Sequence, residues 1–149
     1  MPRSWYEKLY DYMFTLKGTV SGRLLWQAGT STVDKLGGAS LCNCWAVVAD
    51  SKQSFLNVFD YLMLGGGVGF NMQREHVSKL PKIKSVDYVE RFDAKDADFI
   101  VPDSREGWVS LLDKLFTSYF ETGKAFKYST HLIRPYGQDI KGFGGTASG

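Results

Sequence analysis

The segment CWAVVADSKQSFLNVFDYLMLGGGVGFNM, residues 44–72, decides the expected fold. Its first six residues form an apolar, partly β-branched run that is typical of a buried strand, and residues 68–72 fit a second, short strand. Between the two runs, Ser54 can cap a helix that ends at the three glycines 65–67. The apolar face of this helix comprises Phe55, Val58, Phe59, Leu62 and Met63. A strand–helix–strand order predicts parallel pairing within an α/β fold.

Two further helices and a third strand are predicted on either side of this segment. Apolar and aromatic residues at helical spacing indicate a helix over residues 4–17, ended by Gly18. Another helix should begin at Asp103, three residues before Glu106 as in a capping box, and end at Gly123. A strand over residues 125–128 follows it. Residues 74–101 are expected to be mainly irregular, with a possible short strand at residues 86–89. The alternating Asp and Lys residues at 93–98 indicate a solvated face.

Length and composition restrict the class of protein. The 149 residues suit one domain, and 44% of them are hydrophobic and 23% charged. No apolar run approaches the ~20 residues that span a bilayer, and the N-terminus lacks a signal peptide, so a cytoplasmic protein with no membrane partner is expected. The net charge of +2 is spread without a polybasic stripe. This pattern argues against a nucleic-acid polymer as partner but leaves single nucleotides open.

Cys42 and Cys44 are the two cysteines of the chain. On an extended strand both would face one side, with their Cα atoms near the upper limit for a disulfide. Zinc is poorly supported, because Cys-x-Cys is not the usual spacing and His76 and His131 lie in unrelated segments. Each histidine is expected to be a surface or hydrogen-bonded residue. The residue types leave core packing, redox chemistry and metal binding open for the cysteines.

The glycine run GGGVGF, residues 65–70, admits two interpretations. Phe70 occupies the third glycine position of a dinucleotide fingerprint, and the run lacks the lysine of a phosphate-binding loop. A tight turn after the helix is one interpretation. Close approach of a flat ligand to the backbone is the other, and four glycines in five positions favour it slightly. Arg134 and the glycine-rich residues 135–149 would suit an anion or sugar, or form a linker.

Four segments together resemble the monomeric, adenosylcobalamin-dependent ribonucleoside-triphosphate reductases. They are SGRLLWQAGT (residues 21–30), NCW (43–45), FDYLMLGGGVGF (59–70), and PDSREGW (102–108) with IRPYGQDIKGFGGTASG (133–149). The resemblance covers residues 21–149 and implies the first half of a ten-stranded α/β barrel, preceded by an N-terminal helical segment, residues 1–20. The chain is therefore expected to lack the C-terminal half with its radical cysteine. The stretch between Pro81 and Pro102 is shorter than in the family, which argues against an effector site.

The resemblance also implies the site residues. A cysteine matching Cys44 is one of two reducing thiols, and its partner lies in the second half. The substrate pocket would be formed by Asn43, Gly66 and Gly67, with Ala28 and Gly29 nearby. The substrate would be a ribonucleoside triphosphate and the electron donor a thioredoxin-like protein. Adenosylcobalamin would be held mostly by the missing half. Cys42 has no counterpart in the family pattern.

The sequence thus predicts part of a ribonucleotide reductase that makes deoxyribonucleoside triphosphates by thiyl-radical chemistry and is inactive without its C-terminal half. The rival hypothesis is a non-catalytic nucleotide-binding or scaffold remnant of the same fold. A small dithiol or metal protein is a more distant alternative, because it rests on Cys42 and Cys44 alone.

Overall fold

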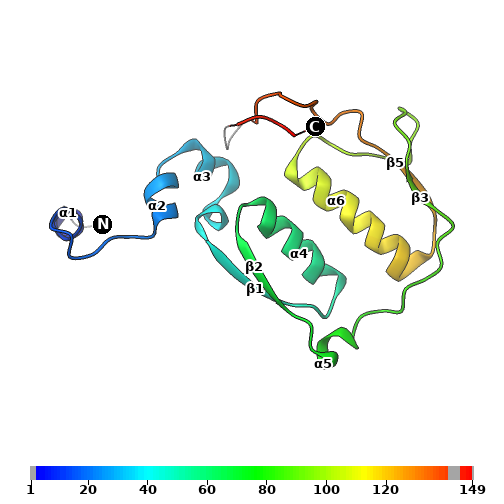
Figure 1. Cartoon of the computed structure of the whole chain (residues 1–149), viewed down its shortest axis with the longest axis horizontal. Helices are drawn as coiled ribbons and strands as arrows, with labels where there is room; N and C mark the ends of the chain where they lie inside the picture. Colours follow the sequence, from blue (N-terminus) through cyan, green and yellow to red (C-terminus); the bar gives the residue numbers. More distant parts are fainter. Residues whose placement is uncertain (1–2, 141–144, 149) are drawn as a thin grey trace. The chain divides into compact units, whose positions relative to one another are not determined.

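A computed structural model describes residues 3–140 and 145–148 (Figure 1). The chain forms two compact units, Met1–Leu41 and Cys42–Gly149. The boundary predicted between residues 20 and 21 lies inside the first unit. None of the helices in the described part of the chain has the length and apolar character needed to cross a membrane.

The first unit is helical. It contains α1 (Arg3–Phe14), α2 (Gly22–Gln27), α3 (Ser31–Leu36) and the 3-10 turn η1 (Gly38–Leu41). The helix predicted over residues 4–17 is confirmed as α1, but it ends earlier than Gly18, because Leu16 adopts a left-handed backbone conformation with φ 57°. The hydroxyl of Ser21 accepts a hydrogen bond from the backbone N–H of Leu24 and so caps α2.

The second unit begins with the predicted strand–helix–strand segment, β1 (Cys44–Val48), α4 (Lys52–Met63) and β2 (Gly67–Asn71). The strands pair in parallel, in register from Cys44 opposite Gly67 to Val48 opposite Asn71, which confirms the predicted topology. The cap of α4 is Ser51, and the predicted cap Ser54 instead completes a capping box with it.

The prediction that β1 is a buried strand is wrong. Trp45 and Val47 are half-buried, whereas the alternating residues Cys44, Ala46 and Val48 are exposed. A helix on one face of a two-stranded sheet leaves the other face open to solvent, and this produces the alternation. The face of β1 that carries Cys44 is therefore accessible.

The rest of the second unit holds α5 (Arg74–Val77), β3 (Val89–Arg91), β4 (Phe99–Ile100), α6 (Arg105–Phe116), the π-helical turn η2 (Thr117–Thr122) and β5 (Phe126–Ser129). β5 pairs in parallel with β3 on one side and β4 on the other. Residues 74–101 are thus more regular than predicted, and the short strand expected at residues 86–89 lies at Val89–Arg91. The solvated face predicted for residues 93–98 is confirmed, because its four charged residues are all exposed. The carboxylates of Asp93 and Asp98 also accept hydrogen bonds from the backbone N–H groups of Thr130 and Lys127.

Helices α4 and α6 lie side by side (Figure 1). Ring contact between Phe55 and Phe116, 5.2 Å between centroids, joins their apolar faces. α6 is confirmed, with Ser104 as its cap in place of the predicted Asp103. Gly123 ends the helical stretch, as predicted, and adopts the left-handed conformation.

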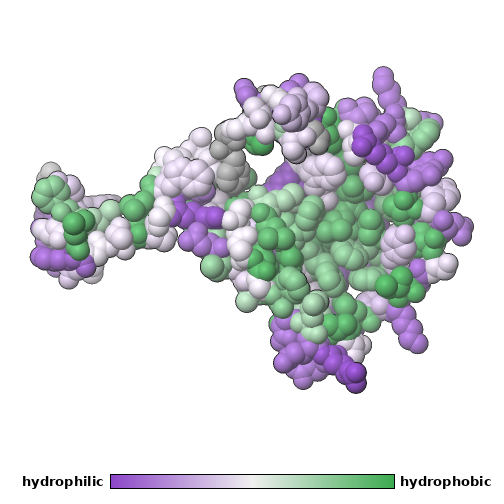
Figure 2. Space-filling view, viewed as in Figure 1, coloured by the Kyte–Doolittle hydropathy of each residue, from purple (hydrophilic) through white to green (hydrophobic). Residues whose placement is uncertain are grey.

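Few apolar side chains are buried in the second unit, and many large ones remain exposed. Leu56, Leu64 and Val101 are buried, whereas Phe70 and Met72 are more than half exposed. Figure 2 shows apolar side chains gathered on the face over α4 and α6. The fold is a mixture of helices and small parallel sheets, compatible with the predicted α/β class. The half-barrel stays a prediction.

Candidate functional site

The free thiol of Cys44 lies at the first position of β1 and is exposed. Its register partner in β2 is Gly67. Directly opposed residues of paired strands present their side chains on the same face. A Cβ built on Gly67 would meet no atom closer than the Asn43 carbonyl oxygen, at 3.7 Å. The thiol therefore borders open space above a residue that has no side chain.

Asn43 lies just before β1 and extends the backbone hydrogen bonding at this end of the sheet. Its carbonyl oxygen accepts a hydrogen bond from the backbone N–H of Gly67 at 2.8 Å. Three of the predicted site residues, Asn43, Cys44 and Gly67, are thus brought together by one strand pair.

Gly66 is buried against the ring of Trp45. A Cβ on Gly66 would lie 2.8 Å from Cδ1 of Trp45 and 3.1 Å from the carbonyl oxygen of Tyr61, both closer than real Cβ atoms tolerate. The absence of a side chain is therefore required for packing at this position. Contact between Gly66 and a substrate stays a prediction.

Ala28 and Gly29 belong to the first unit, between α2 and α3, and both are exposed. Gly29 has a φ of 75° and open space around its Cα, so the turn needs a residue that tolerates the left-handed region. Their predicted place near the substrate stays a prediction.

Cys42 precedes β1 and is the second exposed cysteine. In the described part of the chain no group of three or more His, Cys, Asp or Glu side chains could hold a metal ion. The two histidines have local partners, as expected: Nδ1 of His131 lies 2.7 Å from the hydroxyl of Ser129, and Nε2 of His76 lies 3.3 Å from Glu75.

The cation predicted for an anion site in the C-terminal segment is already paired. Nε of Arg134 lies 2.8 and 3.0 Å from the two carboxylate oxygens of Asp103, and its guanidinium also donates to the carbonyl of Asp139. This pairing explains the role of Arg134 without an anion. Gly142 and Gly144 of the same predicted loop lie outside the described residues.

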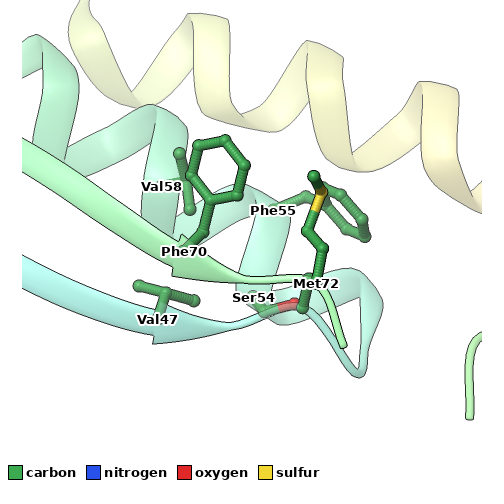
Figure 3. A pocket seen from close by; sticks show the side chains of 7 residues that line it. Val47, Ser54, Phe55, Val58, Phe70 and Met72 are labelled. Carbon is green, nitrogen blue, oxygen red and sulfur yellow. The ribbon is translucent and has the colours of Figure 1, made fainter. Parts of the chain in front are cut away.

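An apolar cavity of about 140 Å³ lies between α4 and the sheet, on the face opposite Cys44 (Figure 3). Its lining consists of Val47, Ala49, Ser54, Phe55, Val58, Phe70 and Met72. Sugar and phosphate groups need several polar partners, and Ser54 is the only polar side chain in this lining. The cavity is therefore unsuited to a nucleotide.

A second, more polar groove of about 330 Å³ runs along β1 and α4, beside Asp50, Gln53 and Asn57. Sites for drug-sized ligands measure about 300–1,000 Å³, and adenosylcobalamin is larger than such ligands. Neither the cavity nor the groove fits that cofactor.

A feature next to the thiol that sequence reasoning missed is the ring pair Trp45–Tyr61. The rings stack with centroids 3.9 Å apart and planes 13° from parallel. Trp45 comes from β1 and Tyr61 from the last turn of α4, so the pair joins the strand that bears the thiol to the helix behind it. Both residues lie in motifs quoted above, but their spacing along the chain does not show that they meet.

Fold and site together define an α/β protein with an exposed thiol at the start of a parallel strand pair. The family model for the B12-dependent ribonucleotide reductase insertion domain matches residues 71–149. The adenosylcobalamin-dependent ribonucleoside-triphosphate reductase of Lactobacillus leichmannii is 36% identical over 192 aligned positions, covering 96% of this chain and 26% of that protein. The enzyme of the same name from Lacticaseibacillus paracasei is 30% identical, covering 95% and 26%. No solved structure matches the chain. The chain belongs to the B12-dependent ribonucleotide reductases.

The chain spans about a quarter of the length of these curated relatives. The alignment with the Lactobacillus leichmannii protein covers 192 positions, more than the 149 residues of the whole chain. The relative therefore has additional residues within the matched region.

Proposed function

We propose that this chain is part of a ribonucleotide reductase in which Cys44 is one of the two reducing thiols. The observation that supports this most directly is the exposed Cys44 thiol opposite the open position at Gly67. Membership of the reductase family supports the same role.

The chemistry explains why a thiol is needed there. Reduction replaces the 2′ hydroxyl of the ribose by hydrogen, and the hydroxyl leaves as water. Two thiols supply the two protons and two electrons, one proton ending on carbon and one in the water, and become a disulfide. A thiyl radical from the rest of the reductase would remove the 3′ hydrogen and return it afterwards, so the radical and the reductants must face opposite sides of one sugar. Cys44 would be one reductant, and a cysteine outside this chain the other.

The sugar would bind on the exposed face of the sheet, over Gly67 and beside Asn43, where the backbone is open to a ligand. Gly66, Ala28 and Gly29 would complete the pocket as the resemblance implies. The printed names of the relatives support a ribonucleoside triphosphate as substrate. A thioredoxin-like protein would reduce the disulfide again, which suits a cytoplasmic enzyme.

Adenosylcobalamin is the cofactor in the names of the relatives. Because neither described cavity of this chain fits it, we propose that the part of the reductase outside this chain binds it.

The large exposed apolar surface supports an incomplete catalytic unit. Phe70 is 55% exposed and Met72 61% exposed, and such side chains are normally covered by further protein. A scaffold remnant of the same fold would also need further protein over these apolar side chains. The two hypotheses therefore have to be distinguished by measuring enzymatic activity.

The test uses two proteins: the isolated 149-residue chain, and a completed reductase in which this chain replaces the aligned quarter of the Lactobacillus leichmannii relative. We expect no deoxynucleotide from the isolated chain, even with adenosylcobalamin and a dithiol, and turnover from the completed reductase. Turnover by the isolated chain would contradict the proposal. A folded, nucleotide-binding chimaera without turnover, beside an active parent enzyme, would favour the scaffold remnant.

A further inference from the structure

The ring pair Trp45–Tyr61 lies directly behind the thiol site. Trp45 follows Cys44 in β1 and faces α4, whereas Cys44 faces the open side of the sheet. Building on the proposed function, we propose that Tyr61 is a positioning residue for Cys44, and that it acts through Trp45 and the glycine turn.

Tyr61 makes two connections from the last turn of α4. Its ring stacks on Trp45 at 3.9 Å between centroids. Its carbonyl oxygen accepts a hydrogen bond from the backbone N–H of Gly66 at 3.0 Å. One residue thus holds both the strand that bears the thiol and the turn that leads into the opposite strand.

The glycine turn passes this restraint on to the site. Gly66 is packed against the indole ring, with no room for a side chain. Its neighbour Gly67 donates a hydrogen bond to the carbonyl oxygen of Asn43, next to Cys44. A continuous series of contacts thus runs from Tyr61 through Gly66 and Gly67 to Asn43, the neighbour of Cys44.

Stacking is what orients the indole. Nε1 of Trp45 is buried and has no hydrogen-bond partner among the described residues. Its orientation therefore depends on the ring of Tyr61 and the backbone of Gly66. Aromatic pairs of this kind contribute about 0.5–1.5 kcal/mol beyond the area they bury.

The sheet itself gives the thiol little support. β1 and β2 form a two-stranded sheet in the described structure, and isolated strand pairs are marginally stable. A slip of one residue would turn Cys44 to the helix-covered face. The contacts of Tyr61 oppose such a slip at the end of the sheet where the thiol lies.

The test compares Tyr61→Leu, which removes the stack, with Tyr61→Phe, which keeps the ring. Phe120→Leu is the control, because it removes a similar ring contact, that with Phe116 at 5.1 Å, from another part of the unit. We expect Tyr61→Leu to speed hydrogen exchange at the Gly67 amide about tenfold in the full chain, the factor for a loss of ~1.4 kcal/mol. Turnover of the completed reductase should fall by a similar factor. Tyr61→Phe should restore both values.

Two outcomes would overturn the positioning role: unchanged Gly67 exchange and turnover in Tyr61→Leu, or an equal loss of turnover in Phe120→Leu, which would indicate a general effect on stability. Failure of the proposed function gives a different result, because Cys44→Ser would then retain turnover whatever the Tyr61 variants do.

Discussion

Cys44 and Gly67 occupy the same register position of the parallel pair β1–β2. The thiol thus lies beside a residue without a side chain, on the face of the sheet opposite α4. A reducing thiol needs open space beside it, because its sulfur must reach one face of the substrate's sugar.

Gly67→Val tests whether the open position serves a ligand. The site has room for a side chain, since its closest contact would be 3.7 Å away, and valine suits a strand. Stability should therefore change little, while nucleotide affinity of the completed reductase should fall about tenfold or more. Calorimetry measures both quantities.

Gly69→Val is the matched control, two residues further along the same face of β2, where a Cβ would also meet only an ordinary contact at 3.9 Å. Lost stability with unchanged nucleotide affinity in Gly67→Val would show that the glycine serves the turn alone.

Gly107→Ala should destabilise the chain although alanine normally favours a helix. Gly107 is buried in the first turn of α6, and an added Cβ would overlap the carbonyl oxygen of Pro102. The greater helix preference of alanine should stabilise the variant by about 1 kcal/mol. Overpacking should destabilise it by about 1–3 kcal/mol. The overlap is with backbone, so we expect a net loss near 2 kcal/mol in the free energy of unfolding.

Ser110→Ala, at an exposed position of the same helix, should change the free energy of unfolding by less than about 0.5 kcal/mol. Equal values for the two variants in urea denaturation would contradict the packing role of Gly107.

Lys52 couples the start of α4 to α6 and η2. Its ammonium group lies 2.9 Å from the carboxylates of both Asp113 and Glu121, and these hydrogen bonds raise its pKa above the usual 10.5. A raised pKa gives stabilisation that is fully present below pH 10.5 and is lost as the pH rises through the folded-state value.

Lys52→Met should therefore lower stability by about 1 kcal/mol at pH 8, and its difference from the wild type should shrink above pH 10.5. Lys82→Met, at an exposed lysine, removes the same charge outside this network and is the control for the loss of a charge. A constant difference between wild type and Lys52→Met across this range would contradict the ion-pair network.

The strand–helix–strand core was predictable because local signals agree there. An apolar run, a helical periodicity and a glycine stop all describe the same topology from residue 44 to residue 72. The short strands β3 and β4 gave no comparable signal, because they are held through pairing with β5 and through the carboxylates of Asp93 and Asp98, which are contacts distant in sequence.

The site was predictable only in part. Resemblance placed Cys44 in the site, and the register then places Gly67 beside it. The stack of Tyr61 on Trp45 joins residues sixteen positions apart, and the pairing of Arg134 with Asp103 joins residues thirty-one apart. Sequence periodicity does not report such contacts.

The two cysteines should behave differently in the completed reductase. Cys44→Ser should abolish turnover and leave nucleotide binding nearly unchanged, because serine has a similar volume but cannot form a disulfide. Cys42→Ser should be far milder, since the partner of Cys44 is expected to be a cysteine outside this chain. Equal losses of turnover in the two variants would contradict the assignment of Cys44 as the reductant.

The central claim is tested most directly by mapping thiols after a single turnover of the completed reductase, with no external reductant. Alkylation of free thiols followed by peptide mass spectrometry identifies the oxidised cysteines. We expect Cys44 in a disulfide with a cysteine outside this chain, and the thiol of Cys42 unoxidised. A Cys42–Cys44 disulfide, or a Cys44 thiol that stays reduced after deoxynucleotide has formed, would contradict the assignment of Cys44 as the reductant.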